Sequence, residues 1–308
     1  MTDAFGREAW SLLLLGVSGF VAGGINAMAG GGTILTFAVL AAILPPGPGR
    51  LVTANVTSKL GLWPGAVGAA WAYRGSRESQ PAWARWLILP SGLGAMIGVG
   101  LLRILPKESF DAVVPWLILL AAVLFAVQPQ LGRLALAVAR RSREQARGTA
   151  SREASDRVNP TRPKAVAAIM PATTAASAPL PAGRLAFVSG LQLLVGIYGG
   201  YFGAGIGILM LGTLAMLGLG DVHAVNASKN LLAATVNGVA TLVLVAVALV
   251  GGFAVSWVHV AILALTSIIG GIVMAHAAQR LPAAVVRRLI AIIAFGLSGY
   301  YFWREWVG

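Results

Sequence analysis

The stretch "AMAGGGTILTF", residues 27–37, lies inside an apolar run that is long enough to cross a membrane. Each glycine in a helix interior costs roughly 1 kcal/mol relative to alanine, so three in succession predict that the helix breaks here. A second glycine cluster, "VGIYGGYFGAGIGIL" at residues 195–209, interrupts another apolar run. The two breaks are the features from which the fold can be predicted.

The composition is that of a polytopic integral membrane protein. Of 308 residues, 57% are hydrophobic and 11% are charged, and that charged fraction is about half of what a soluble domain carries. Several apolar runs approach the roughly 20 residues needed to cross the hydrocarbon. The first run lacks the features of a cleavable signal peptide, so we expect it to be retained. The chain has no cysteine, and we predict neither a metal site nor a cofactor.

The chain divides into two halves that resemble each other. The motif "ANVTSKLGLWPGAVGA" at residues 54–69 is matched by "VNASKNLLAATVNGVA" at residues 225–240, with the Ser-Lys pairs aligned. We therefore predict two transmembrane repeats, residues 1–139 and 184–308, joined by a linker at residues 140–183.

The linker region is basic. Nine of the 23 Lys and Arg residues lie between residues 133 and 164, among Ala, Ser, Pro and Thr and without an apolar period. Such a segment is typical of a flexible cytoplasmic loop that obeys the positive-inside rule. We favour that interpretation over a nucleic-acid-binding linker and expect no nucleic-acid partner.

Each half contains five apolar segments. The second segment of each set has only about a dozen residues, too few to span comfortably. The first two segments therefore form either a re-entrant hairpin with glycines at its tip or one broken helix. The fold class is all-α, and each half has a glycine-broken helix pair plus three full transmembrane helices. The predicted segments are 11–29, 33–44, 52–73, 85–105 and 112–131, then 184–203, 206–218, 223–250, 256–279 and 286–303.

Charge asymmetry favours inverted halves. If the linker lies on the cytoplasmic side, the loop with the arginines at 74–85 also lies there. The arginines at 280–288 lie on the same side only if each half crosses the membrane an odd number of times. Inverted repeats with short, glycine-interrupted segments in matching places are typical of secondary transporters, whose substrate site lies near the membrane midplane.

The charges inside the predicted helices are positive. All ten Asp and Glu residues lie outside the apolar runs or at their margins, whereas Lys59 and Lys229 stand at matching places within two helices. An ionisable group in the membrane needs a counter-charge or a substrate, so we predict a small anionic substrate. Snorkelling of either lysine to the interface is the structural alternative.

Polar groups near the breaks complete the predicted site. Short helices that begin near Thr33 and Gly205 would aim free N–H groups and positive dipole ends into the protein centre. Helix packing is the alternative for glycines such as Gly196, Gly200 and Gly203, and stabilisation of a break is the alternative for the polar side chains. The candidate substrate-binding residues are Asn26, Gly31, Gly32, Thr33, Asn55, Thr57, Ser58, Lys59, Gly205, Asn226, Ser228, Lys229 and Asn230.

Two other functions share parts of this pattern. An anion channel would have the same positive lining. An intramembrane serine hydrolase would use Ser18, in "GVSGF", with His259 or His276 as its base. Four-residue patterns of this kind arise easily in a glycine-rich chain, so we predict that the protein is not an enzyme.

The motifs "INAMAGGGTIL" and "GGYFGAGIGIL", with the basic linker between the halves, resemble the TauE/SafE family of sulfite and organosulfonate exporters. The resemblance implies a multi-pass carrier of a bacterial-type cytoplasmic membrane that exports sulfite, thiosulfate, sulfoacetate or other sulfonates. It also implies two repeats of four helices, from which the odd number of crossings departs. The anion, the coupling ion and the formation of a homodimer stay open.

Overall fold

The described residues of the computed structural model are helical apart from short turns. They include no strand, so the all-α prediction is confirmed. The structure describes residues 2–28, 31–72, 82–127, 182–216, 222–277 and 283–307, with the single positions 130, 133 and 137. Most of the predicted linker, 140–183, lies outside these residues.

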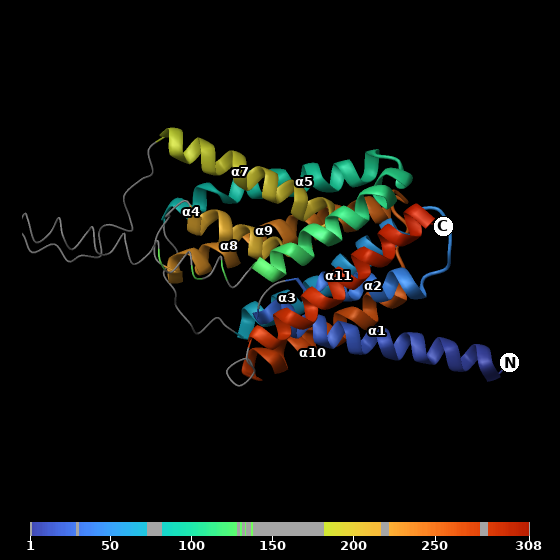
Figure 1. Ribbon diagram of the computed structural model, residues 1–308. Coiled ribbons are helices and arrows are strands. Elements are labelled where there is room, and N and C mark those ends of the chain that lie inside the picture. Colours follow the sequence, from blue (N-terminus) through green and yellow to red (C-terminus); the bar gives the residue numbers. More distant parts are fainter. Residues whose placement is uncertain are drawn as a thin grey trace, which may run out of the picture.

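The helices follow the predicted apolar segments closely (Figure 1). In the first half they are α1 (Thr2–Met28), α2 (Thr33–Ile43), α3 (Arg50–Ala72), α4 (Ala82–Trp86), α5 (Ile88–Ile104) and an unlabelled helix over Lys107–Val127. In the second half they are α7 (Ala182–Tyr201), α8 (Ile206–Met216), α9 (Val222–Leu249), α10 (Trp257–Ala277) and α11 (Ala283–Val307). The largest difference is at α1, which begins at Thr2 rather than at residue 11, because its first turns are polar and invisible to an apolar pattern.

Six described helices are long and apolar enough to cross a membrane, as expected of a multi-pass protein. The helix α3 is not among them, because Arg50, Lys59 and neighbouring polar residues lower its mean hydropathy. Three of its polar residues, Asn55, Thr57 and Ser58, are nevertheless fully buried in the protein. The six segments are Glu8–Asn26, Trp83–Ile104, Lys107–Val127, Ala182–Tyr201, Ser228–Leu249 and Trp257–Met274.

One predicted segment, 85–105, is interrupted at Leu87. Pro90 has no N–H and cannot donate to the carbonyl of Trp86, so the helical ladder fails at this point. The N–H of Leu87 instead bonds the carbonyl of Ala84 at 3.2 Å, and the chain resumes as α5. The short helix α4 is the result.

The helices α1 and α2 form a hairpin rather than one interrupted helix. In a continuous helix, residues 22 and 32 would lie about 15 Å apart along the axis. Here α1 packs against α2, and a Cβ placed on Gly32 would overlap the backbone of Ala22. The chain therefore turns back at the first glycine cluster.

The helices group across the boundary between the two halves (Figure 1). The second-half helix α10 packs along α1 and α3, and the first-half helix α5 packs along α7 and α9. Each half therefore contributes its fourth segment to the helix group of the other.

Close backbone contacts at small residues accompany this exchange. A Cβ on Gly23 of α1 would overlap the backbone of Ser267 in α10, and one on Gly200 of α7 would overlap the backbone of Ala95 in α5. Lipid provides no hydrophobic force between helices, so close packing at small residues is what holds them together. The packing role considered for Gly200 is thus confirmed.

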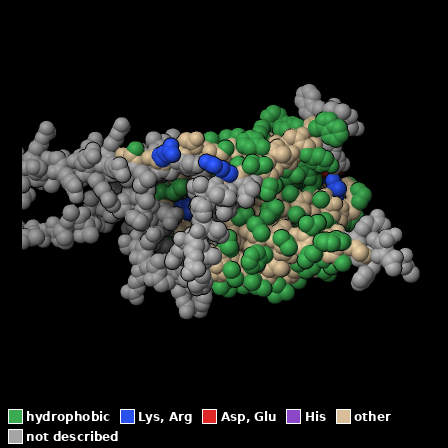
Figure 2. Space-filling view, turned by 60° about the horizontal axis from the view of Figure 1, so that its bottom comes forward, with side chains coloured by type: hydrophobic (Ala, Val, Ile, Leu, Met, Phe, Trp, Pro, Cys, Tyr) green, Lys and Arg blue, Asp and Glu red, His purple; other side chains and the backbone are tan. Residues whose placement is uncertain are grey.

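Figure 2 shows a surface that is hydrophobic over its middle, with Lys and Arg side chains towards the two ends of the described body. Large apolar side chains are widely exposed, including Trp10 at 67%, Leu194 at 61% and Trp303 at 63%. A soluble protein rarely exposes so much contiguous apolar area. The outer surface is therefore suited to lipid.

Candidate functional site

The first glycine break is held by the side chain of Asn26. Its Oδ1 accepts hydrogen bonds from the N–H groups of Gly31, at 2.9 Å, and Gly32, at 2.8 Å. Gly31 has φ +120°, which glycine adopts without steric cost. The half-buried Thr33 follows as the first residue of α2. An anion at this break would have to displace the amide oxygen of Asn26.

The second glycine break is held by backbone and tyrosine groups. The N–H groups of Phe202 and Gly203 both donate to the carbonyl of Tyr198, at 2.9 and 3.0 Å. The Tyr198 hydroxyl donates to the carbonyl of Ala204 at 2.6 Å. Gly203 and Gly205 have φ of +84° and +74°, so left-handed backbone at two nearby positions turns the chain from α7 into α8.

Gly205 lies buried immediately before α8. Its carbonyl accepts from the N–H groups of Ile208 and Leu209, while no hydrogen bond within the described residues uses its own N–H. The start of a helix carries about half a positive charge. The second break therefore presents an N–H donor to a ligand, whereas the N–H groups at the first break already donate to Asn26.

Two side chains of α3 bind the C-terminal end of α7. Lys59 Nζ donates to the carbonyl oxygens of Gly199, at 3.0 Å, and Gly200. Asn55, one turn earlier, donates through Nδ2 to the carbonyl of Tyr201 at 2.9 Å. The last carbonyls of a helix have no intrahelical partner, so α3 caps α7 and joins the two halves.

The charge of Lys59 is only partly balanced. The carbonyl end of α7 carries about half a negative charge. The two hydrogen bonds use two of the three N–H groups of the ammonium. In the described part of the chain, Lys59 forms no ion pair with a carboxylate. Its Cε lies 3.3 Å from the position that a Cβ on Gly203 would take, so the charge sits beside the second break.

Asn55 leaves one acceptor unused. The residue is fully buried, and its Oδ1 has no hydrogen-bond partner within the described structure. Turning the amide over would place Oδ1 against the carbonyl of Tyr201, so the observed orientation is the favourable one. An unsatisfied buried acceptor costs about 1–3 kcal/mol, and a donor on a bound molecule would remove that cost.

The neighbouring hydroxyls on α3 contact other helices. The hydroxyls of Ser58 and Thr36, from α2, share a hydrogen bond of 2.6 Å. The hydroxyl of Thr57 accepts the N–H of Ser256, just before α10, at 3.3 Å. Thr57 and Ser58 are both fully buried. Thr57 and Ser58 thus fix α3 against its neighbours and lie one turn or less from Lys59.

Phe125 brings the two breaks together. A Cβ on Gly31 would overlap its ring, and a Cβ on Gly205 would lie 3.8 Å from its Cε2. Phe37 of α2 and Phe202 of the second break also meet edge to face, with ring centroids 5.5 Å apart. The two glycine clusters therefore adjoin the same aromatic side chains in the protein core.

The second-half candidates, residues 226–230, lie near the start of α9 and differ in burial. Ser228 is buried and Lys229 is half-buried, and both have polar partners in the structure. Asn230 is exposed and is not part of the buried centre. The side chain of Asn226 lies outside the described residues.

Sequence reasoning missed several residues at the centre. Tyr198 lies within the second glycine motif, and its hydroxyl binds the carbonyl of Ala204 six residues later. Its place in that motif is the signal that could have identified it. Phe125 and Thr36 carry no sequence signal, because aromatic and hydroxyl residues in apolar helices are common. Their roles follow from tertiary contacts alone.

Two of the three polar groups of the hydrolase alternative, Ser18 and His259, form hydrogen bonds with other groups. The Ser18 hydroxyl donates to the carbonyl of Leu15 in its own helix at 2.8 Å. His259 Nδ1 lies 2.5 Å from the hydroxyl of Ser256. The side chain of His276 lies outside the described residues.

Comparison with known proteins identifies relatives among membrane transporters. The family model described as "Sulfite exporter TauE/SafE" matches residues 15–301. A curated protein of Sinorhizobium sp, "Probable membrane transporter protein ORF9", is 28% identical over 224 residues, which cover 71% of this chain. The match spans 66% of that relative's length, slightly less than two thirds. No solved structure matches the chain significantly.

Proposed function

The chain belongs to the TauE/SafE family of membrane transporters, and on that premise we propose that it is a secondary carrier which exports small sulfur-containing anions by alternating access. The family and the apolar helices make it a multi-pass protein of the bacterial cytoplasmic membrane. The proposed substrates are sulfite, thiosulfate, sulfoacetate or other sulfonates. No catalytic step is part of the proposal.

Lys59 is the observation that carries this proposal. Its ammonium lies beside the second glycine break, and its described contacts include carbonyls but no carboxylate. A charge this far inside a membrane protein is expensive unless a partner balances it. A bound anion would supply the missing charge, and its oxygens would accept a hydrogen bond from the remaining N–H of the ammonium.

The second break offers further groups to the same anion. The N–H of Gly205 points from the positive end of α8, and Oδ1 of Asn55 is available to a donor on the substrate. Lys229, Ser228, Asn226 and the first break would belong to the path that the substrate follows rather than to its resting position. Asn230, being exposed, would lie at the edge of that path.

An inverted arrangement of the halves is part of the proposal. Gly49, before α3, adjoins the side chain of Lys107, and Gly252, before α10, adjoins Arg103. The turn between α2 and α3, the turn after α5 and the turn between α9 and α10 therefore lie at the same end of the molecule, which is the outer end under this proposal. Both termini also lie at one end of the molecule (Figure 1). Each half would then enter from the opposite side, and rocking of one helix group against the other would expose the break alternately.

Counterflow in proteoliposomes tests the proposal directly. Vesicles preloaded with unlabelled sulfite, thiosulfate or sulfoacetate should accumulate the labelled anion transiently and saturably. Lys59→Met should reduce the initial rate by at least about a hundredfold, because an uncharged thioether of similar size replaces the ammonium that balances the anion. Lys59→Arg should retain part of the rate.

Lys107→Met is the matched control. It removes the same charge from an exposed position at the end of a helix, so transport should stay within about twofold of wild type. Conductance without counterflow would favour the channel alternative. Normal counterflow by a folded Lys59→Met protein would contradict the proposed site, and no transport of any of the three anions by wild type would contradict the substrate class.

A further inference from the structure

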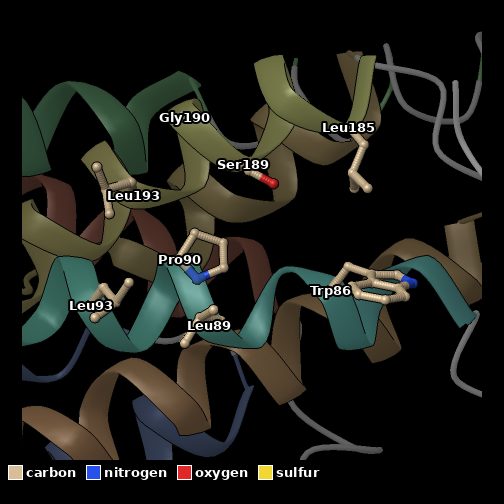
Figure 3. A pocket seen from close by; sticks show the side chains of 8 residues that line it. All are labelled: Trp86, Leu89, Pro90, Leu93, Leu185, Ser189, Gly190 and Leu193. Atoms are coloured by element: carbon tan, nitrogen blue, oxygen red, sulfur yellow. The ribbon is translucent and has the colours of Figure 1, made fainter. Parts of the chain in front are cut away.

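An apolar groove lies between α5 and α7, away from the glycine breaks (Figure 3). It has a volume of about 420 Å³. Trp86 and Leu185 line one end, Leu93 and Leu193 line the other, and Pro90 and Ser189 lie between them. The lining contains no charged side chain, so the groove is unsuited to a small anion and is separate from the proposed substrate site.

The groove exists because α5 and α7 touch along only part of their length. Beyond it, Gly98 of α5 approaches the backbone of Ile197 so closely that a Cβ would overlap the carbonyl. Within the groove, a Cβ on Gly190 would meet no atom within 4 Å. Small residues thus leave this space open, and no side chain of the described structure fills it.

The groove opens towards lipid. Trp86 is 70% exposed and Leu89 is 69% exposed on its rim. It covers the first two turns of α5, about 10 Å of helix. Half of a hydrocarbon core is about 15 Å thick. The groove therefore matches a chain from a single leaflet.

Arginines precede lining residues of the groove in the sequence, in α4 just before α5 and near the start of α7. Arg85 precedes Trp86, Arg184 precedes Leu185, and both arginines are exposed. The positive-inside rule places these arginines at the cytoplasmic surface, where anionic lipids concentrate. Tryptophan at this depth is typical of the headgroup boundary.

We propose that this groove binds one anionic phospholipid of the cytoplasmic leaflet. An acyl chain lies between α5 and α7, and the phosphate lies between Arg85 and Arg184, with the Trp86 indole at the glycerol level. The complementary charge at one end and the apolar, lipid-facing lining at the other select this occupant. A second copy of the chain would not need the two arginines.

Native mass spectrometry of the full-length protein, released from nanodiscs of phosphatidylglycerol and phosphatidylethanolamine, tests the proposal. Wild type should retain one phosphatidylglycerol in preference to phosphatidylethanolamine by about tenfold. Gly190→Leu should fill the groove and abolish retention. Arg85→Gln combined with Arg184→Gln should remove the headgroup preference while leaving retention of a lipid.

Gly296→Leu is the matched control, because Gly296 lies exposed on α11 and its Cβ would also meet nothing within 4 Å. This variant should retain phosphatidylglycerol as wild type does. Retention by Gly190→Leu at the wild-type level would overturn the proposal. So would equal retention of the two lipids by wild type, or a dimer that Gly190→Leu dissociates while no lipid is retained.

Discussion

The two glycine breaks are similar in sequence, yet they are stabilised by side chains of opposite hydrogen-bonding character. At the first, Asn26 accepts from an N–H six residues later, that of Gly32. At the second, Tyr198 donates to a carbonyl six residues later, that of Ala204. A glycine cluster therefore specifies that the helix breaks, while the side chain before it decides which backbone groups remain for a ligand.

The difference has a functional consequence. Asn26 satisfies the N–H groups at the start of α2, whereas the N–H of Gly205 before α8 has no partner in the described part of the chain. Lys59 lies beside that second break. Under the proposed function, the anion rests at the second break, and the first break acts as a fixed scaffold.

Gly31→Ala should destabilise the protein more than any other substitution considered below. Alanine there would overlap the Phe125 ring and would hold φ at +120°, which a residue with a Cβ rarely adopts. Strain and overpacking together should destabilise the protein by about 4 kcal/mol. The melting temperature in detergent measures this effect, and Gly296→Ala, in open space on an exposed helix, should not lower it, because alanine is favoured over glycine in a helix interior by roughly 1 kcal/mol.

Gly205→Ala sharpens this contrast within the same experiment. Its Cβ would lie 3.8 Å from Phe125 without a clash, so only the left-handed φ of +74° would be strained. We expect a loss of about 1 kcal/mol. Equal destabilisation by Gly31→Ala and Gly205→Ala would contradict the view that the first break is the tightly packed one.

The next effect compares the two side chains that hold the breaks. Asn26→Leu leaves two buried N–H groups without an acceptor, which should cost about 2–4 kcal/mol. Tyr198→Phe removes one hydrogen bond and should cost about 1 kcal/mol. Unfolding in a denaturing detergent series measures both. A Tyr198→Phe loss as large as that of Asn26→Leu would show that the two breaks depend equally on these side chains.

A smaller effect is expected on selectivity at Asn55. Under the proposed function, its unused Oδ1 should favour substrates with a donor, so that wild type should transport 2-hydroxyethanesulfonate about tenfold better than ethanesulfonate. Asn55→Leu should abolish the preference. Competition of the two compounds for labelled substrate measures the ratio within each variant, which cancels differences in the amount of folded protein. A preference that survives in Asn55→Leu would assign it to another group.

The smallest effect is at the contact between α2 and α3. Ser58→Ala removes the hydrogen bond of 2.6 Å to Thr36 and should cost about 1 kcal/mol. A double-mutant cycle with Thr36→Ala, followed by thermal unfolding, isolates the pairwise energy. Strictly additive losses would mean that these hydroxyls act separately.

The helices and the glycine breaks could be predicted from the amino-acid sequence. Apolar length, the triple glycine at 30–32 and the repeated Ser-Lys motif are local properties, and the observed helices follow them closely. Some helix ends were misplaced, as at Thr2, because polar turns beyond the apolar core carry no hydrophobic signal, and the interruption at Leu87 was not predicted. The family was also readable from the two glycine motifs.

The contacts between distant segments could not be predicted from the sequence and become apparent in the folded chain. The contact of Lys59 with Gly199 joins residues 140 positions apart, and the exchange of α5 and α10 between the halves brings distant segments together. In a membrane nearly every helix face is apolar, so hydrophobic periodicity does not identify the packing partner. The partner is chosen by the fit of small residues and by capping of open helix ends, and both become visible only when the chain is folded.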